Sequence, residues 1–253
     1  MDSAEVRAQV QAIEGLLSDA EAECLYLLAK NCGGSIVEIG SWKGKSTVCL
    51  ALGSKAGGGG RVFAIDLHRG APDCDGAYGA EDTEPIFREN IKRAGVDDIV
   101  IPLVMKSEEA AKGWTEPIAL LWIDGAHDYD NVKKDFSSWE PHLKEGEVIA
   151  IHDALYALDY NYPGIRKVMY KYIFQSDRFL NVHFYGSIVC ATKVTKLSIQ
   201  DRLLKLQKLL QYYLLPLVYA TLNVIARILA KVRLLAPARA VKFKVLSLIH
   251  RGN

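Results

Sequence analysis

Short apolar segments alternate with helical segments along residues 1–153, and this alternation limits the possible folds more than any other feature of the chain. Apolar runs typical of buried strands lie at residues 35–40, 61–66, 99–104, 119–124 and 147–153. Helical periodicity is found at residues 4–30, 46–52, 84–94 and 129–142. Strands that alternate with helices build a parallel sheet with helices on both faces, so the sequence predicts an α/β, doubly wound fold.

The segment that follows departs from this alternation. Two apolar runs, residues 180–185 and 187–193, meet at Gly186. A glycine between two strands is typical of a hairpin, so we expect an antiparallel pair that closes the sheet. Residues 69–83 are polar and irregular, and a loop of this length usually carries a function.

Acidic residues stand at the ends of the predicted strands, where ligands bind in parallel sheets. The first strand ends Glu38-Ile-Gly40, and the next ends at Asp66. Gly40 allows a sharp turn out of the strand, and Gly44 allows a ligand to approach the backbone. Asp66 can accept both hydroxyls of a ribose. The two acids suit a cationic sulfonium that carries adenosine, so we expect S-adenosylmethionine as the ligand.

The segment Gly40–Ser46 has other interpretations. A dinucleotide site contains G-x-G-x-x-G, and this segment lacks the close first pair of glycines. A P-loop contains G-x-x-x-x-G-K-[ST], and this segment is one residue too short. A plain strand-to-helix turn is a further alternative. We favour the methyl donor, because the carboxylate of Glu38 is badly placed for a polyphosphate.

A second group of polar residues follows two other strands. Asp124, His152 and Asp153 are suited to hold one hard divalent cation, Mg²⁺ or Mn²⁺. His127 has the ordinary pKa of a general base near neutrality. Structural interpretations exist for each: Asp124 can cap a helix, and His127 can hold a loop. His152 can face away from the site, because neighbouring residues of a strand face opposite sides.

Three segments of the chain resemble class I methyltransferases that use S-adenosylmethionine. They are IVEIGSWKGKSTVCLA at residues 36–51, VFAIDLH at 62–68 and ALLWIDGAHDYDNVKKDFSSWEPHLKEGEVIAIHD at 119–153. Their order and spacing are most similar to the macrocin and mycinamicin sugar O-methyltransferases and the cephalosporin-hydroxylase-like group. Catechol O-methyltransferase resembles the chain more distantly. The resemblance covers about residues 30–195 and implies a Rossmann-like sheet of seven strands with an antiparallel last strand.

The resemblance also implies which residues hold the cofactor. The methionine part would lie against Glu38, Gly40, Ser41, Trp42, Gly44 and Ser46. Asp66 would hold the ribose, and Ser107 would lie near the adenine. His68 is a further candidate for cofactor contact, since it also stands at a strand end.

For the chemistry, the resemblance implies a catalytic pair and a cation site. Asp124 would contact the cofactor and bind Mg²⁺ together with His152 and Asp153. Relatives usually have Asp or Glu followed by Asp or Asn at these last two positions, so His152 departs from the pattern. His127 matches the catalytic base, a histidine or lysine in relatives. The implied reaction transfers a methyl group to a hydroxyl of a sugar or glycan-type acceptor.

Two loops flank this site and are expected to choose the acceptor, residues 69–83 and 154–165. Their tyrosines either stack on a sugar ring or serve packing alone; they are Tyr78, Tyr156, Tyr160 and Tyr162.

Charge divides the chain into two parts, expected as a domain at 1–195 and a helical tail at 196–253. The tail contains eleven Lys or Arg and one acid, for a net charge of +10, whereas the remainder carries −9 of the total of +1. An acidic body argues against nucleic acid as a partner. Half of all residues are hydrophobic, which allows a sizeable core.

The tail is expected to form two basic amphipathic helices, at residues 198–214 and 217–235, separated by Pro216. Arg202, Lys205 and Lys208 share one side of the first. Such helices lie in a membrane interface, so we expect peripheral membrane contact through residues 198–250. A homodimer or a packed helix pair is an alternative. A spanning helix at residues 209–226 is another, at the lower limit of length.

These features predict a methyltransferase at the cytoplasmic, inner face of a membrane. The five cysteines are scattered without a CxxC pair, which favours a reducing compartment and no zinc site. The N-terminal residues are polar and acidic and do not resemble a secretory signal. The alternative from another class is a scaffold or binding protein that retains a methyltransferase body.

Overall fold

The structure is a computed structural model, and it describes residues 3–70, 81–155 and 162–231. Several features expected from the sequence lie outside these residues: most of the loop at 69–83 with Tyr78 and Cys74, the residues Tyr156 and Tyr160, and the tail from 232 onward.

Seven strands form one sheet in the order β3-β2-β1-β4-β5-β7-β6. Their bounds are Ser35–Ile39 (β1), Val62–Ile65 (β2), Val100–Leu103 (β3), Ile118–Ile123 (β4), Leu143–Ile151 (β5), Phe179–Tyr185 (β6) and Ile188–Lys193 (β7). Neighbouring strands from β3 to β5 pair in parallel, while β7 runs antiparallel to both β5 and β6. The Rossmann-like sheet with an antiparallel last strand and the hairpin at Gly186 are therefore confirmed.

The strand register places four strand ends side by side. Ile39 of β1 pairs with Ile65 of β2 and with Ile123 of β4, and Ile123 pairs in turn with Ile151 of β5. Each of these residues is the last of its strand. The residues that come next are Gly40, Asp66, Asp124 and His152, so the polar strand ends found in the sequence meet along one edge of the sheet.

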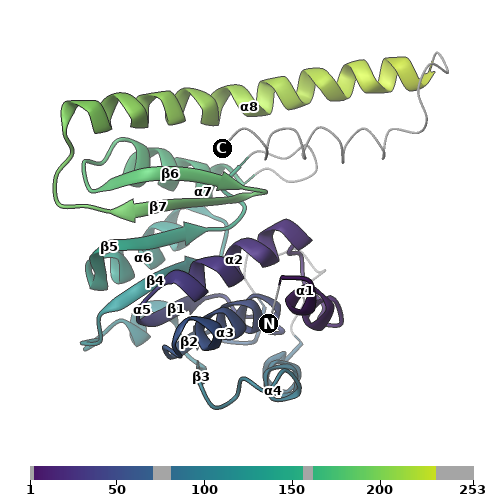
Figure 1. The fold of residues 1–253 in the computed structure, drawn as a ribbon, viewed down its shortest axis with the longest axis vertical. Helices are drawn as coiled ribbons and strands as arrows, with labels where there is room; N and C mark the ends of the chain where they lie inside the picture. Colours follow the sequence, from purple (N-terminus) through teal and green to yellow (C-terminus); the bar gives the residue numbers. More distant parts are fainter. Residues whose placement is uncertain (1–2, 71–80, 156–161, 232–253) are drawn as a thin grey trace.

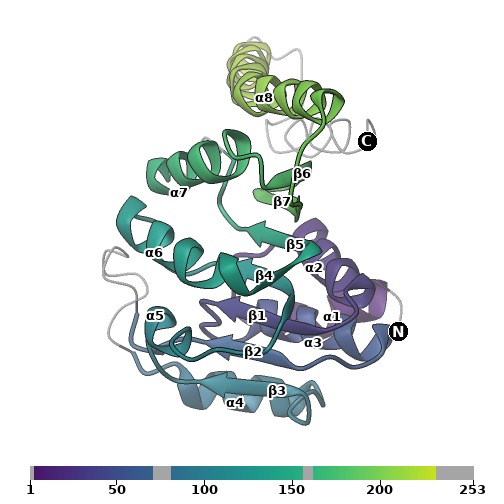
Figure 2. The same cartoon turned by 90° about the vertical axis from the view of Figure 1, so that its left-hand side faces the viewer.

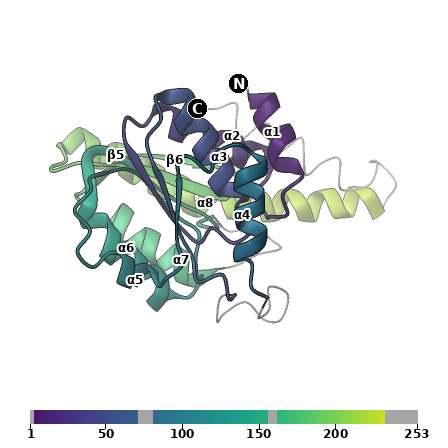
Figure 3. The same ribbon diagram turned by 90° about the horizontal axis from the view of Figure 1, so that it is seen from below.

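Helices cover both faces of the sheet, as expected (Figures 1, 2 and 3). The helices α1 (Ser3–Gln11), α2 (Asp19–Asn31), α3 (Lys45–Gly57) and α4 (Glu84–Arg93) share one face. The other face carries α5 (Ser107–Ala110), α6 (Tyr129–Trp139), the 3₁₀ turn η1 (Glu140–His142), α7 (Pro163–Val168) and the π-helical turn η2 (Met169–Phe174). Side chains alternate between the two faces along each strand. Ile36 and Leu120 therefore belong to one apolar core, and Val37 and Leu121 to the other.

The N-terminal helical stretch is two helices rather than one. Ser18 ends the connection between them and caps α2: its side chain accepts a hydrogen bond from the backbone N–H of Glu21, and the Glu21 carboxylate accepts one from the N–H of Ser18. This reciprocal capping box fixes where α2 begins. The periodicity of residues 4–30 hides the break because apolar residues continue through it.

The C-terminal tail begins with one long helix, α8 (Ile199–Lys231), which runs along the β6 edge of the sheet (Figures 1 and 2). The expected division at Pro216 is wrong, since the helix continues through that residue. A proline removes one backbone N–H but does not by itself force a chain out of a long helix. No helix within the described ranges is long and apolar enough to cross a membrane.

Candidate active site

The turn after β1 is shaped by Gly40, which has a φ of +87°. A Cβ atom there would lie 2.2 Å from the backbone oxygen of Asp124, so the ends of β1 and β4 approach as closely as only glycine allows. Beyond it, the backbone N–H groups of Ser41 and Trp42 both donate to Asp66 Oδ2, at 2.9 and 2.7 Å. The strand-end acid Asp66 therefore holds the turn in place.

Glu38 lies behind this turn rather than in the open site. Its side chain is fully buried and accepts hydrogen bonds from the hydroxyls of Ser46 and Thr47, at the start of α3. Burial raises the pKa of Glu38 to about 8, although the two hydroxyls act in the opposite direction. Gly44 adopts a φ of +87°, and a Cβ atom there would meet the ring of Phe87 at 3.1 Å.

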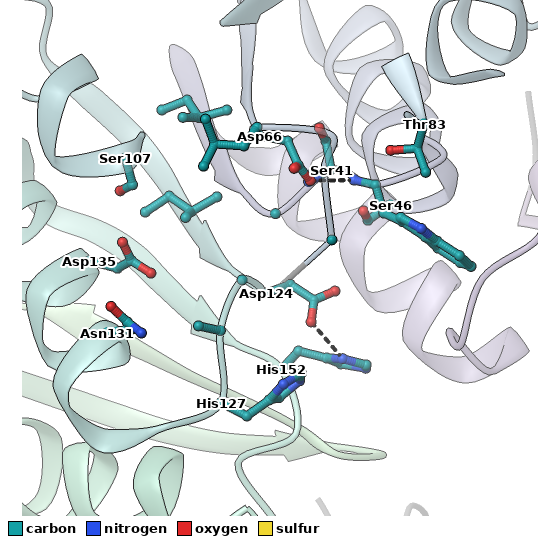
Figure 4. A pocket seen from close by; sticks show the side chains of 18 of the residues that line it. Ser41, Ser46, Asp66, Thr83, Ser107, Asp124, His127, Asn131, Asp135 and His152 are labelled. Atoms are coloured by element: carbon teal, nitrogen blue, oxygen red, sulfur yellow. Dashed lines mark hydrogen bonds and ion pairs between the residues drawn. The ribbon is translucent and has the colours of Figure 1, made fainter. Parts of the chain in front are cut away.

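A cavity of about 440 Å³ opens over the strand ends (Figure 4). A volume in this range suits a small organic ligand. Ten of the residues proposed above for the cofactor, the base or the cation line it: Gly40, Ser41, Trp42, Ser46, Asp66, Ser107, Asp124, His127, His152 and Asp153. Glu38, Gly44 and His68 are not among its lining residues. Glu38 and Gly44 therefore lie behind the residues that line the cavity.

The connection between α1 and α2 forms part of the wall. Gly15, Leu16 and Leu17 line the cavity, and Lys45 Nζ donates to the Gly15 carbonyl at 3.2 Å. Next to it, Lys43 Nζ lies 2.7 Å from the carboxylate of Glu14. The N-terminal segment is thereby attached to the first turn of α3, close to the entrance.

Asp124, His152 and Asp153 form a tight cluster at one end of the cavity. His152 Nδ1 lies 3.0 Å from Asp124 Oδ1 and 3.5 Å from Asp153 Oδ2. One ligand atom from each of the three residues lies within 4.8 Å of the others. β5 ends at Ile151, and the two residues after it form a turn in which Asp153 has a φ of +51°. Because His152 lies in this turn and not in the strand, the alternation of side chains along a strand does not direct it away from Asp153.

His127 is held at the edge of this cluster. Its Nε2 lies 3.4 Å from Asp153 Oδ2. The imidazole ring stacks on Tyr162, with centroids 4.1 Å apart and planes inclined by 22°. Asp128, the next residue, caps α6 by accepting hydrogen bonds from the N–H groups of Asp130 and Asn131. The histidine is therefore fixed between a capped helix and an aromatic ring.

The cluster contains a residue that the sequence analysis missed, Glu21 of α2. Its Oε1 lies 3.7 Å from His152 Nε2 and accepts hydrogen bonds from the backbone N–H and the hydroxyl of Ser187, at 2.7 and 2.8 Å. Glu21 is buried, as is His152. The local sequence explains Glu21 fully as half of a capping box, so no signal pointed to a second role.

Electrostatic coupling within the cluster is strong. Burial opposes the charge on His152, but Asp124, Asp153 and Glu21 raise its pKa well above the usual value. Burial also opposes ionisation of Glu21, but His152 and the groups of Ser187 and Ser18 lower its pKa to about 2. The pKa of Asp153 is lowered by His127 and His152 in spite of its burial. The cluster therefore combines carboxylates with a histidine that carries a proton.

Two further lining residues missed by the sequence analysis, Asn131 and Asp135, lie on α6. Together with Ser107 they occupy the side of the cavity opposite Ser46 (Figure 4). The indole N–H of Trp139 donates to Ser107 Oγ at 2.8 Å. Burial raises the pKa of Asp135 to about 6. Asn131 and Asp135 are four residues apart and so share one helix face, a spacing that could have indicated a polar wall.

Comparison with known proteins agrees with this geometry. Residues 37–154 match the family described as a methyltransferase domain. This part of the chain is therefore similar to a methyltransferase domain. Among curated proteins, the uncharacterized protein y4gI of Sinorhizobium fredii is 29% identical over 119 residues. That match spans 47% of this chain but only 13% of the relative's length.

Solved structures of O-methyltransferases share the fold of this chain. The O-methyltransferase TomG of Streptomyces achromogenes, in complex with SAM, has a TM-score of 0.55 at 17% identity, covering 76% of this chain and 87% of its own. The O-methyltransferase of Bacillus cereus, in complex with SAH, has a TM-score of 0.52 at 23% identity, with coverage of 76% and 89%. The O-methyltransferase NovP has a TM-score of 0.61 at 16% identity, with coverage of 75% and 88%. The fold is that of class I methyltransferases.

Proposed function

We propose that the chain transfers the methyl group of S-adenosylmethionine to a hydroxyl of a sugar or glycan-type acceptor. The observation that carries the proposal is one cavity that joins the Asp66-bound turn after β1 to the cluster of Asp124, His127, His152 and Asp153. The methyl donor would occupy the first part, and the acceptor hydroxyl would approach the second. The acceptor class follows from the resemblance to the macrocin and mycinamicin enzymes.

In this proposal the cofactor lies along the strand ends. Ser41, Trp42 and Ser46 contact the methionine part of the cofactor. Asp66 binds the ribose, and Ser107 lies near the adenine. Gly40 allows the backbone to turn sharply after β1. Asp124 stands between the cofactor and the cluster. Glu38 and Gly44 support the site without lining the cavity. Glu38 accepts a hydrogen bond from Ser46 and so holds the start of α3, and Gly44 leaves room for the ring of Phe87.

For the chemistry, His127 accepts the proton of the acceptor hydroxyl while the oxygen forms a bond to the methyl carbon. The bond from that carbon to sulfur breaks, and the sulfonium becomes the neutral thioether of S-adenosylhomocysteine. The contact of His127 Nε2 with Asp153 stabilises the protonated imidazole. Holding donor and acceptor in line supplies much of the acceleration.

A divalent cation fits beside this base. His152 Nδ1 lies 3.0 Å from Asp124 Oδ1 and 3.5 Å from Asp153 Oδ2, and one ligand atom from each of the three residues lies within 4.8 Å of the others, close enough to share one cation. These residues would hold Mn²⁺ or Mg²⁺, and the cation would supply a positive charge that lowers the pKa of the acceptor hydroxyl.

Isothermal titration with S-adenosylmethionine tests the function. Saturable binding of S-adenosylmethionine and of S-adenosylhomocysteine supports the proposal, whereas a scaffold with a degenerate body would bind neither. Incubation with methyl-labelled S-adenosylmethionine and a panel of hydroxylated acceptors then tests the transfer. Transfer that proceeds fully in EDTA would remove the cation from the mechanism and leave His127 as the base.

We further propose that α8 attaches the protein to an anionic membrane surface. The expected basic stripe is only partly free: the buried Lys205 donates to the carbonyl of Ser176, and the exposed Arg202 pairs with Asp177 at 2.6 Å. The outward face is apolar instead. At helical spacing it exposes Leu203, Leu206, Leu210, Leu214 and Leu217, each by half or more of its side chain.

An apolar face of this width suits the interface of a bilayer, and the net charge of +10 over residues 196–253 favours anionic lipids. An acceptor linked to lipid would then be within reach. The triple change Leu206→Gln, Leu210→Gln and Leu217→Gln should abolish co-sedimentation with phosphatidylglycerol vesicles. The same three positions changed to Met should retain it. A full-length protein that ignores vesicles and sediments as a dimer would assign the face to a second copy.

A further inference from the structure

Glu21 reaches the cluster from α2, and its carboxylate has a fixed position. One oxygen accepts hydrogen bonds from the backbone N–H and hydroxyl of Ser18, and the other from the same two groups of Ser187. Ser18 precedes α2, and Ser187 follows Gly186 in the β6–β7 turn. A carboxylate held by two segments so far apart in sequence cannot move away from His152 without disturbing both.

His152 is oriented by this arrangement. Nδ1 faces Asp124 and Asp153, while Nε2 is buried and makes no hydrogen bond within the described part of the chain. The carboxylate of Glu21 stands 3.7 Å from Nε2. A negative charge on that side holds a proton on Nε2, so Nδ1 is the nitrogen that would give up its proton to a cation in the cluster. Histidines that bind metals commonly direct their second nitrogen at a carboxylate in this way.

We propose that Glu21 is a positioning residue that presents His152 Nδ1 as a nitrogen ligand, so that the cluster selects a first-row transition ion such as Mn²⁺ over Mg²⁺. The inference rests on the cation site of the proposed function. Two carboxylates alone favour Mg²⁺, whereas an added imidazole favours transition ions. The chain has no carboxylate at position 152, where its resemblance implies one, and Glu21 supplies the partner that a histidine ligand needs.

Pulsed EPR of the full-length protein loaded with Mn²⁺ tests the assignment directly. Wild type should show modulation from a coupled ¹⁴N nucleus, and His152→Asp should bind Mn²⁺ without it. Titration calorimetry should find tighter binding of Mn²⁺ than of Mg²⁺ in wild type, and this preference should shrink in His152→Asp. Glu21→Gln should weaken Mn²⁺ binding by about 10- to 100-fold, the usual effect of losing such a partner.

A matched control is Glu145→Gln. The Glu145 carboxylate accepts hydrogen bonds from the N–H and hydroxyl of Thr195, as Glu21 does from Ser187, but it is not part of the cluster. Its change should leave Mn²⁺ affinity intact. Should Glu21→Gln fail to fold, Ser187→Ala removes one bond to the carboxylate and should lower Mn²⁺ affinity in the same direction.

Each contrary result has its own meaning. Unchanged Mn²⁺ affinity and ¹⁴N coupling in Glu21→Gln would restrict Glu21 to capping α2 and overturn the inference. Binding of Mn²⁺ by wild type without ¹⁴N coupling would remove His152 as a ligand but leave the cation site. If wild type binds neither ion, both the inference and the cation site fail. Binding of S-adenosylmethionine would still decide the methyltransferase proposal separately.

Discussion

Tyr212 of α8 donates its hydroxyl to the backbone carbonyl of Ala154, at 2.8 Å. Ala154 directly follows Asp153, so the C-terminal helix is bonded to the segment that carries the cluster. The ring of Tyr212 is buried against Phe174 and Phe184. The first half of α8 is therefore part of the folded body, although the change in charge places it in the tail.

The first prediction concerns this bond. Tyr212→Phe leaves the buried carbonyl of Ala154 without its partner and should lower the free energy of unfolding by about 1–3 kcal/mol. Urea denaturation followed by circular dichroism measures the change. The neighbouring Tyr213 is half exposed, so Tyr213→Phe is the control and should have little effect. Equal midpoints for the two variants would show that the bond does not contribute.

Asp66 is expected to serve both the turn and the cofactor. Asp66→Ala removes the acceptor of two backbone N–H groups and the proposed acceptor of the ribose hydroxyls. Loss of a charged hydrogen bond, about 1.5–3 kcal/mol, should weaken S-adenosylmethionine binding by roughly 10- to 150-fold. Calorimetry measures the affinity, with the exposed Asp82→Ala as control. An unchanged affinity would separate Asp66 from the cofactor.

Stability should depend on pH through Glu38. Its pKa is about 8 in the folded protein, against 4.5 as the ordinary value, because the side chain is buried. Between these values the folded state keeps a proton that the unfolded chain has released, so this group makes stability fall as pH rises, on the order of 1.4 kcal/mol per pH unit.

Glu38→Gln should remove that dependence. The variant should gain stability relative to wild type as pH is raised from 5 to 8, in urea denaturation at each pH. Glu89→Gln is an exposed control on α4 and should follow the wild-type curve. Parallel curves for wild type and Glu38→Gln would mean that Glu38 is already ionised when folded.

His127 is expected to act as the base. His127→Ala should lower turnover by roughly 10²- to 10⁴-fold, the usual contribution of general-base catalysis, and leave S-adenosylmethionine binding intact. Transfer of labelled methyl to an acceptor found in the panel measures turnover. His183, on β6, does not line the cavity and is the control. Wild-type turnover in His127→Ala would return this residue to a packing role against Tyr162.

The arrangement of strands and strand ends could be predicted because its causes are local. A buried parallel strand such as β4 is a continuous apolar run, and the residue after it is easily found. Asp124, His152 and Asp153 then meet because neighbouring parallel strands end at one edge. The same reasoning does not give the partners of Glu38: the sequence places it beside the cofactor, and its buried side chain accepts hydrogen bonds from the hydroxyls of Ser46 and Thr47 in α3.

Residues that depend on packing between distant elements could not be predicted. Glu21 reaches His152 only because α2 packs against the β6–β7 turn, whose Ser187 lies 166 residues later in the chain. For α8, the sequence shows a basic side and an apolar side, but it does not show which of them packs against the rest of the protein. Lys205 turns inward and donates a hydrogen bond to the carbonyl of Ser176, and this leaves the leucines outside.

The attachment of residues 15–17 to the start of α3 has a consequence for the rate of a full catalytic cycle. In the proposed function, S-adenosylhomocysteine must leave the cavity after every transfer, and Leu16, Gly15 and Lys45 line that cavity. The ion pair between Lys43 and the largely exposed Glu14 is accessible to screening by salt. If these contacts slow the departure of S-adenosylhomocysteine, turnover under the proposed function should rise with ionic strength, because release of product limits the rate of many enzymes.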